Sequence, residues 1–254
     1  MKKVRIIEID DNNNSNIFKN VNFEAVSVTT SKGDEALQDA LFEQIASDCS
    51  LVLDSGGGND SRKVLKLISD SGESDNFTYL IPMNNSRAQI QNAKDTYELI
   101  NNPSKCIFIL NQVHNLENVE KEFMFFFGNK DLGISPAFKE KVKYLTVGYT
   151  PAFELAAMHQ QTITQLAVLA ENLQGQDLKT LLYEQSGGDK QKYLSLFSKY
   201  RQSQMANDYL KTVLPQFVDA LKDTTNVCLA NTKGGVGKST ISWQIVSYIL
   251  ENQE

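Results

Sequence analysis

The chain has 254 residues, of which 41% are hydrophobic and 22% charged, and this is enough apolar material for the core of one large α/β domain. The formal net charge of −6 excludes a protein that coats nucleic acid over its whole surface, so any nucleic-acid contact must be regional. The three cysteines are too far apart for a zinc site or a disulfide framework, and no apolar run approaches the ~18 residues that span a bilayer, so we expect a cytoplasmic protein with reduced thiols.

Seven short aliphatic or β-branched runs alternate with longer helical patterns along the chain. This alternation is typical of βαβ units. Several of the runs are apolar throughout, as expected for strands that helices cover on both faces. We therefore predict an α/β fold with a doubly wound, mostly parallel sheet flanked by helices, and strands at residues 4–10, 23–28, 51–54, 77–82, 106–111, 142–147 and 227–231.

Apolar residues also recur at helical intervals. One stripe runs from Leu155 to Leu173 and a second from Leu210 to Leu221, and each predicts an amphipathic helix. Pro215 lies in the second stripe and is expected to kink or restart that helix. A further stripe follows a glycine-rich loop and is made by Ile241, Ile245, Tyr248 and Ile249.

Polar side chains stand at the ends of several predicted strands. The first strand ends in Glu8 and Asp10. The third ends in Asp54, directly before a serine and three glycines, which places a carboxylate beside a flexible turn. The fifth ends in Asn111. Carboxyl ends of parallel strands lie at one edge of a sheet, where α/β proteins bind ligands.

The strongest motif is Asn231-Thr232-Lys233-Gly234-Gly235-Val236-Gly237-Lys238-Ser239-Thr240, between an apolar strand and an amphipathic helix. This is the context of a phosphate-binding loop. Glycines let backbone amides surround the phosphates, Lys238 contacts the β and γ oxygens, and the Ser239 hydroxyl is a ligand for Mg²⁺. We predict nucleotide contacts from Gly234, Gly235, Val236, Gly237, Lys238, Ser239 and Thr240.

The loop resembles the deviant Walker A loop of the ParA/MinD ATPases, because Thr232 replaces the usual first glycine and Lys233 follows it. The resemblance implies ATP and Mg²⁺ as ligands and a homodimer that closes on ATP. In that family the extra lysine contacts the phosphates of the partner subunit. Lys233, Lys238 and Asp10 are therefore the expected catalytic residues.

The same resemblance assigns the strand-end residues. Asp54 looks like the Walker B acid that holds Mg²⁺. Asp10 looks like the acid that orients the attacking water, and it is also an expected metal residue with Ser239 and Asp54. The chain departs from the family at Glu8, where aspartate is usual, and at Asp11, where proline is usual. The family's adenine contacts fall on Asn111 and, more distantly, on Pro151, whereas His114 and His159 receive no role.

The order of the motifs differs from that of the family, in which the phosphate loop comes first. Here residues 226–254 carry the first strand, the loop and its helix, and residues 1–222 carry the rest. We interpret the chain as a circularly permuted single domain, 1–254; a fragment cut from a tandem ATPase is the alternative. A permutation at a surface turn between a helix and a strand would leave the fold intact.

Residues 190–222 hold six Lys or Arg and two Asp, a net charge of +4 in an acidic chain. This segment is either a solvated helical face or a patch for sequence-independent DNA contacts through Lys190, Lys192, Lys199 and Arg201. The first hypothesis is a ParA-like ATPase that partitions plasmid DNA and whose hydrolysis a centromere-binding or adaptor protein stimulates. The alternatives are a MinD-like membrane-cycling ATPase, which the absence of a basic amphipathic terminal helix disfavours, and a conjugation-associated recruiting ATPase.

Overall fold

The computed structural model describes residues 3–11, 24–232 and 234–252, and these form two compact units. One unit comprises 3–11, 24–149 and 215–252 and holds the sheet, whereas residues 150–214 form a helical unit. Phe23, with which the second predicted strand begins, lies outside the described residues. No helix of the described ranges is both long enough and apolar enough to cross a membrane.

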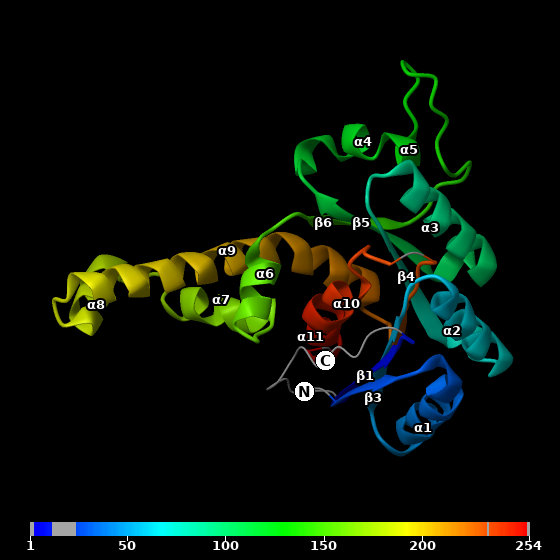
Figure 1. Ribbon diagram of the computed structural model, residues 1–254, viewed down its shortest axis with the longest axis horizontal. Coiled ribbons are helices and arrows are strands. Elements are labelled where there is room, and N and C mark those ends of the chain that lie inside the picture. Colours follow the sequence, from blue (N-terminus) through cyan, green and yellow to red (C-terminus); the bar gives the residue numbers. More distant parts are fainter. Residues whose placement is uncertain (1–2, 12–23, 233, 253–254) are drawn as a thin grey trace. The chain divides into compact units, whose positions relative to one another are not determined.

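The sheet has seven strands in the order β2-β1-β3-β7-β4-β5-β6, and every neighbouring pair is parallel (Figure 1). Each of the seven predicted strands is confirmed, with small shifts at the ends. The fold is α/β, with an all-parallel sheet flanked by helices, of a Rossmann-like or P-loop type. The strands are β1 (Lys3–Ile9), β2 (Glu24–Val28), β3 (Cys49–Ser55), β4 (Phe77–Met83), β5 (Cys106–Val113), β6 (Tyr144–Gly148) and β7 (Asn226–Leu229).

One face of the sheet packs against α1 (Gly33–Ala46), α2 (Asn59–Asp70) and α3 (Arg87–Ile100). Alternate strand residues such as Leu53 and Phe108 join buried helix residues there, because successive side chains of a strand point to opposite faces. The short helices α4 (Val119–Glu122) and α5 (Met124–Phe127) follow β5.

The other face of the sheet carries the helix that follows β7. This helix consists of α10 (Lys238–Ile241), the π-helical turn η5 (Ser242–Val246) and α11 (Ser247–Glu251), without a break between them. It packs against β1 and β3, as Figure 1 shows. Its apolar stripe is buried at Ile241, Ile245 and Ile249, whereas Tyr248, which the prediction included, is exposed. Helices therefore cover both faces of the sheet, which explains why the strands are apolar throughout.

The last strand of the chain, β7, lies in the middle of the sheet between β3 and β4. A short segment, 222–225, joins it to the end of α9 (Lys190–Leu221). Within this join the Thr225 carbonyl accepts a hydrogen bond from Leu51 N at 3.1 Å, and the Thr224 and Thr78 hydroxyl groups lie 3.1 Å apart. The join is therefore bonded on both sides to the strands that flank β7.

The helical unit contains α6 (Ala152–Met158), α7 (Ile163–Asn172), α8 (Leu178–Ser186) and the part of α9 before Pro215. The prediction of one helix along the stripe from Leu155 to Leu173 is wrong. Gln160 has a left-handed φ of 54°, and Thr162 caps a new helix through a reciprocal pair of hydrogen bonds with Gln165. Local capping therefore breaks a segment whose apolar periodicity is continuous.

Helix α9 runs through Pro215 without restarting, contrary to one of the two expected outcomes. Proline removes one backbone donor from a helix interior, a loss of about 3 kcal/mol or more. Pro215 is exposed, so water can satisfy the freed carbonyl of the preceding turn. Residue 215 is also where the division between the two units falls.

Candidate functional site

The predicted phosphate loop leaves the carboxyl end of the central strand β7 and ends at the first turn of α10. Gly235 and Gly237 have φ values of 73° and 86°, in the left-handed region that favours glycine. A side chain at either position would strain the turn that carries the chain into the helix. Lys233 lies outside the described residues, so its role in a dimer stays a prediction.

The first part of the loop is anchored to neighbouring strands and helices. Asn231 Nδ2 donates to the Pro82 carbonyl at 2.6 Å, and Thr232 N donates to Thr96 Oγ1 at 3.2 Å. The Ser61 hydroxyl, fully buried in the first turn of α2, lies 2.8 Å from the Asn231 carbonyl. These bonds tie the loop to β4, α3 and α2.

The last part of the loop is held by Asn111, at the end of β5. Asn111 Nδ2 donates to the Val236 carbonyl at 2.8 Å, and Asn111 Oδ1 accepts from Gln112 N at 2.9 Å. A Cβ atom at Gly237 would collide with the Asn111 amide nitrogen. The residue predicted to contact adenine is thus in direct contact with the phosphate loop.

Lys238 is buried, with 7% of its surface exposed, and three carboxylates act on it. Burial lowers the pKa of its ammonium group from the ordinary value, whereas Asp54, Asp10 and Asp60, in that order, favour the charged form and raise it. Three acids around one lysine make the surroundings of Lys238 negative. A polyphosphate would meet repulsion there unless a cation came with it.

Asp54 is buried at the carboxyl end of β3, next to β7. Burial is the main cause that raises its pKa to about 6, while the Ser239 and Ser242 hydroxyl groups favour the charged form. Ser242 Oγ donates to Oδ2 at 3.0 Å, but Oδ1 has no hydrogen-bond partner among the residues that the structure describes.

A buried oxygen without a partner is costly, and it is available to a ligand. Together with the Ser239 hydroxyl it offers the oxygen donors that Mg²⁺ prefers. The described residues contain no cluster of three or more His, Cys, Asp or Glu that could hold a metal ion by itself. The donor set therefore fits a Mg²⁺ site that phosphate oxygens complete, since Mg²⁺ is commonly held by one or two carboxylates plus the phosphates of a substrate.

Gly56 explains how Asp10 comes close to this site. A Cβ atom at Gly56 would lie 2.8 Å from Asp10 Cγ and 2.8 Å from Asp60 Oδ2, so both carboxylates pack over the bare backbone. Gly56 N also donates to the Ile9 carbonyl at 2.7 Å, which bonds the turn after β3 to the end of β1. Asp10 and Asp54 both act on Lys238, so the structure brings these two carboxylates to the same lysine.

Asp60 was missed by the sequence analysis. It lies in the first turn of α2, 5% exposed, and one of its oxygens accepts from Asp11 N at 3.3 Å. Asp11 in turn accepts from Thr30 N and Thr30 Oγ1 and pairs with Lys63 at 3.2 Å, and these contacts lower its pKa. The signal was a carboxylate just after the glycine turn, at a helix N-terminus.

Pro151 was predicted as a weaker adenine contact, whereas His114 and His159 were given no role. Pro151 is the N-cap residue of α6 in the helical unit. The His114 ring lies 5.1 Å from the Tyr149 ring, and the His159 backbone ends α6. None of these contacts indicates a chemical role.

The basic residues Lys190, Lys192, Lys199 and Arg201 are all exposed on α9 in the helical unit. Tyr193 and Phe197 stack one turn apart on the same stretch, with ring centroids 6.4 Å apart and planes 8° apart. The segment therefore combines exposed cations with aromatic rings, a combination that nucleic-acid-binding surfaces use.

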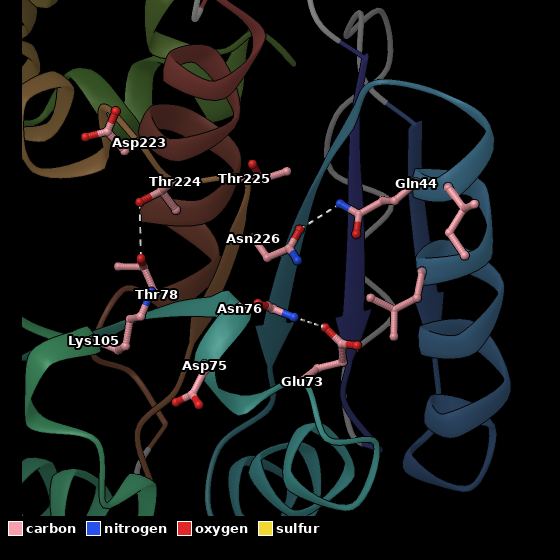
Figure 2. Close-up of a pocket in the computed structure, with 12 residues that line it drawn as sticks. Gln44, Glu73, Asp75, Asn76, Thr78, Lys105, Asp223, Thr224, Thr225 and Asn226 are labelled. Atoms are coloured by element: carbon pink, nitrogen blue, oxygen red, sulfur yellow. Dashed lines mark hydrogen bonds between the residues drawn. The ribbon is translucent and has the colours of Figure 1, made fainter.

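A separate cleft of about 510 Å³ opens at the amino ends of β4 and β7 (Figure 2). Hydrogen bonds from Gln44 to Asn226 and between Thr78 and Thr224 lie along it, and its charged lining residues are Glu73, Asp75, Asp223 and Lys105. Because the strands are parallel, this cleft lies at the sheet edge opposite to the phosphate loop. It contains no predicted site residue.

No family model, no curated protein and no solved structure matches this chain. The class of protein therefore rests on the structure, which is an all-parallel α/β protein with a glycine-rich loop at the carboxyl end of its central strand. The class of ligand is therefore inferred from the chemistry of the loop and of the acids beside it.

Proposed function

We propose that this chain is a Mg²⁺-dependent ATPase of the ParA type, which dimerises on ATP and partitions plasmid DNA. The observation that carries the proposal is the position of Lys238, which is buried in the first turn of α10 among Asp54, Asp10 and Asp60. A lysine at the end of a glycine-rich loop and at the start of a helix is well placed to bind the phosphate groups of an anionic ligand.

Each residue of the site has a separate role in the proposed reaction. The loop amides and Lys238 would bind the phosphates, and Ser239 and Asp54 would hold Mg²⁺, which would supply positive charge to offset the negative charge of the phosphates. Asp10, which packs over Gly56 near the same lysine, orients the water that attacks the γ-phosphate. Lys233 acts across a dimer interface on the partner's nucleotide.

The elements are circularly permuted relative to the ParA/MinD family. The observation that supports this is that β7, the last strand in the chain, lies between β3 and β4. In addition, α11 packs against β1, so the helix after the loop ends beside the strand that would follow it in the unpermuted order. A variant that starts at residue 226 and joins the present ends should therefore fold and bind the same ligand.

The helical unit supplies the DNA contacts through Lys199, Arg201 and their exposed neighbours on α9. Contacts of this kind neutralise phosphates without reading sequence. A centromere-binding or adaptor protein then stimulates hydrolysis and releases the dimer from DNA.

The test is the oligomeric mass of the protein without nucleotide, with ADP and with ATP and Mg²⁺. We expect a dimer only with ATP and Mg²⁺. The Asp10→Ala variant should prolong this dimer, because hydrolysis is blocked. Lys238→Ala should abolish nucleotide binding, and Lys233→Ala should abolish the dimer while retaining some nucleotide binding.

Lys222→Ala is the matched control, since Lys222 is exposed and lies between α9 and β7. It should behave as the unmodified protein. A protein that binds ATP but stays monomeric at every concentration would remove the dimer switch. A protein that binds neither ATP nor any polyphosphate would remove the proposal altogether.

A further inference from the structure

The Asn111 side chain is buried and makes a direct hydrogen bond to the phosphate loop. It lies on β5, which β4 separates from the loop-bearing strand β7, yet its side chain reaches the loop. Only 9% of Asn111 is exposed. Both polar atoms of its amide are engaged, Nδ2 with the Val236 carbonyl and Oδ1 with Gln112 N.

The bond to Val236 fixes the direction of a peptide unit in the loop. The Val236 carbonyl and the Gly237 N–H belong to one planar trans peptide, so they point in opposite directions. Holding the carbonyl toward Asn111 therefore turns the Gly237 N–H away from Asn111. A backbone N–H that is held free of such contacts can contribute to an anion site formed by successive amides of a loop.

Gly237 supports the same contact independently. The Asn111 amide nitrogen occupies the space that a side chain at 237 would need, and Gly237 has a left-handed φ of 86°. The two residues are therefore fitted to each other. Asn231 and Thr232 anchor the first part of the loop, and Asn111 anchors its last part.

We propose that Asn111 is a positioning residue that presets the phosphate loop for a polyphosphate, and that it does not read the base. This inference rests on the proposed function and specifies its ligand class. The part of the ligand that Asn111 serves is the triphosphate chain, so ATP, GTP and inorganic tripolyphosphate depend on it equally. A preset loop loses less freedom when the anion binds, which raises affinity for all three.

The test compares Asn111→Ala and Asn111→Asp with the unmodified protein in binding Mg²⁺-ATP, Mg²⁺-GTP and Mg²⁺-tripolyphosphate by calorimetry. Asn111→Ala should weaken all three by the same factor, roughly three- to tenfold, which is what the loss of one hydrogen bond gives. Asn111→Asp should weaken them further, because a carboxylate would face the Val236 carbonyl. The matched control is Asn226→Ala, which removes a buried amide at the opposite edge of the sheet and should leave all three affinities unchanged.

A second measurement needs no nucleotide. Hydrogen exchange of the peptide spanning residues 232–240 should be faster in Asn111→Ala than in the unmodified protein and unchanged in Asn226→Ala. Melting temperatures of all variants set the temperature at which binding is measured, so that every variant is folded.

The outcomes separate the inference from the function on which it rests. If Asn111→Ala weakens ATP but leaves GTP and tripolyphosphate unchanged, Asn111 reads adenine and the inference is overturned while the ATPase stands. A lower melting temperature with unchanged affinity for all three ligands overturns it too, since the role is then structural only. An unmodified protein that binds none of the three ligands overturns both.

Discussion

Glu8 and Asp54 face each other as register partners on β1 and β3, and both are buried, at 2% and 1% exposure. Neighbouring parallel strands place these two side chains on the same face of the sheet. The charge of Glu8 adds to burial in raising the pKa of Asp54 to about 6. Ionised Asp54 therefore has an electrostatic cost that a bound cation would relieve.

This cost predicts how stability depends on pH. Burial raises the folded-state pKa of Asp54 from its ordinary value of 3.8 to about 6, so between pH 4 and 6 the folded state holds the proton more tightly than the unfolded state does. The contribution of Asp54 to the free energy of unfolding is full below this window and is lost as the pH rises through it, by about 3 kcal/mol in total. Asp54→Asn should therefore be more stable than the unmodified protein at pH 7.5 but not at pH 4.

Urea unfolding at the two pH values measures this difference, with the exposed Asp70→Asn as the control. Mg²⁺-ATP should raise the melting temperature of the unmodified protein at pH 7.5 and have little effect on Asp54→Asn. Equal pH slopes for Asp54→Asn and the unmodified protein would show that the buried carboxylate is not the source of the dependence.

Gly56→Ala should impair hydrolysis. The new methyl group would press on Asp10 and Asp60 at 2.8 Å and displace the carboxylate that is expected to orient water. We expect turnover to fall at least tenfold with ATP affinity changed less. In the control, Gly58→Ala, the backbone at φ 65° and ψ −122° is strained for alanine and costs about 1–3 kcal/mol of stability, but the methyl group meets open space, so turnover per folded molecule should persist. Equal turnover in the two variants would argue against Asp10.

Ser61→Ala should lower the free energy of unfolding, because Ser61 ties the start of the phosphate loop to α2. The Ser61 hydroxyl lies 2.7 Å from the Gly56 carbonyl, 2.8 Å from the Asn231 carbonyl and 2.8 Å from the Ser55 hydroxyl, so it links the turn after β3 to the start of the phosphate loop. Removing it should cost about 1–3 kcal/mol, because buried carbonyls lose their donor. Denaturant unfolding measures the loss, and the exposed Ser198→Ala should be neutral. A neutral Ser61→Ala would mean that water replaces the hydroxyl.

Replacing Lys199 and Arg201 together with alanine should weaken ATP-dependent DNA binding by the same factor for unrelated sequences. Each lost phosphate contact lowers the slope of log affinity against log salt by about 0.9 for duplex DNA. Titrations between low and moderate salt give this slope for the double variant. The matched control is Lys66→Ala, an exposed lysine on α2 of the other unit. An unchanged slope would leave α9 as a solvated face.

The strands could be predicted because short runs that are apolar throughout, such as that of β7, are typical of strands in a sheet that helices cover on both faces. Asp54 and Asp10 could be placed near the loop because parallel strands end at one edge. Helix ends were harder, since the break before Ile163 depends on the cap formed by Thr162 and Gln165, which apolar periodicity does not reveal.

Contacts between distant segments could not be predicted. Asn111 contacts Val236 only because the order of the strands brings these two segments together. The apolar pattern of one sequence predicts where the strands are but does not reveal their order in the sheet. The π-helical turn η5 likewise has no sequence signal, because Ser242 and the residues after it follow an ordinary helical stripe.

The central place of β7 also bears on how the chain matures on the ribosome. Its partners β3 and β4 are synthesised long before it, so until residues 226–229 emerge each of them presents an unsatisfied edge. Vectorial synthesis thus leaves the nascent protein as two incomplete half-sheets, a form open to chaperones and to misassociation. The strand that completes the sheet is thus followed at once by the glycine-rich loop, so both are completed in the same late stretch of synthesis.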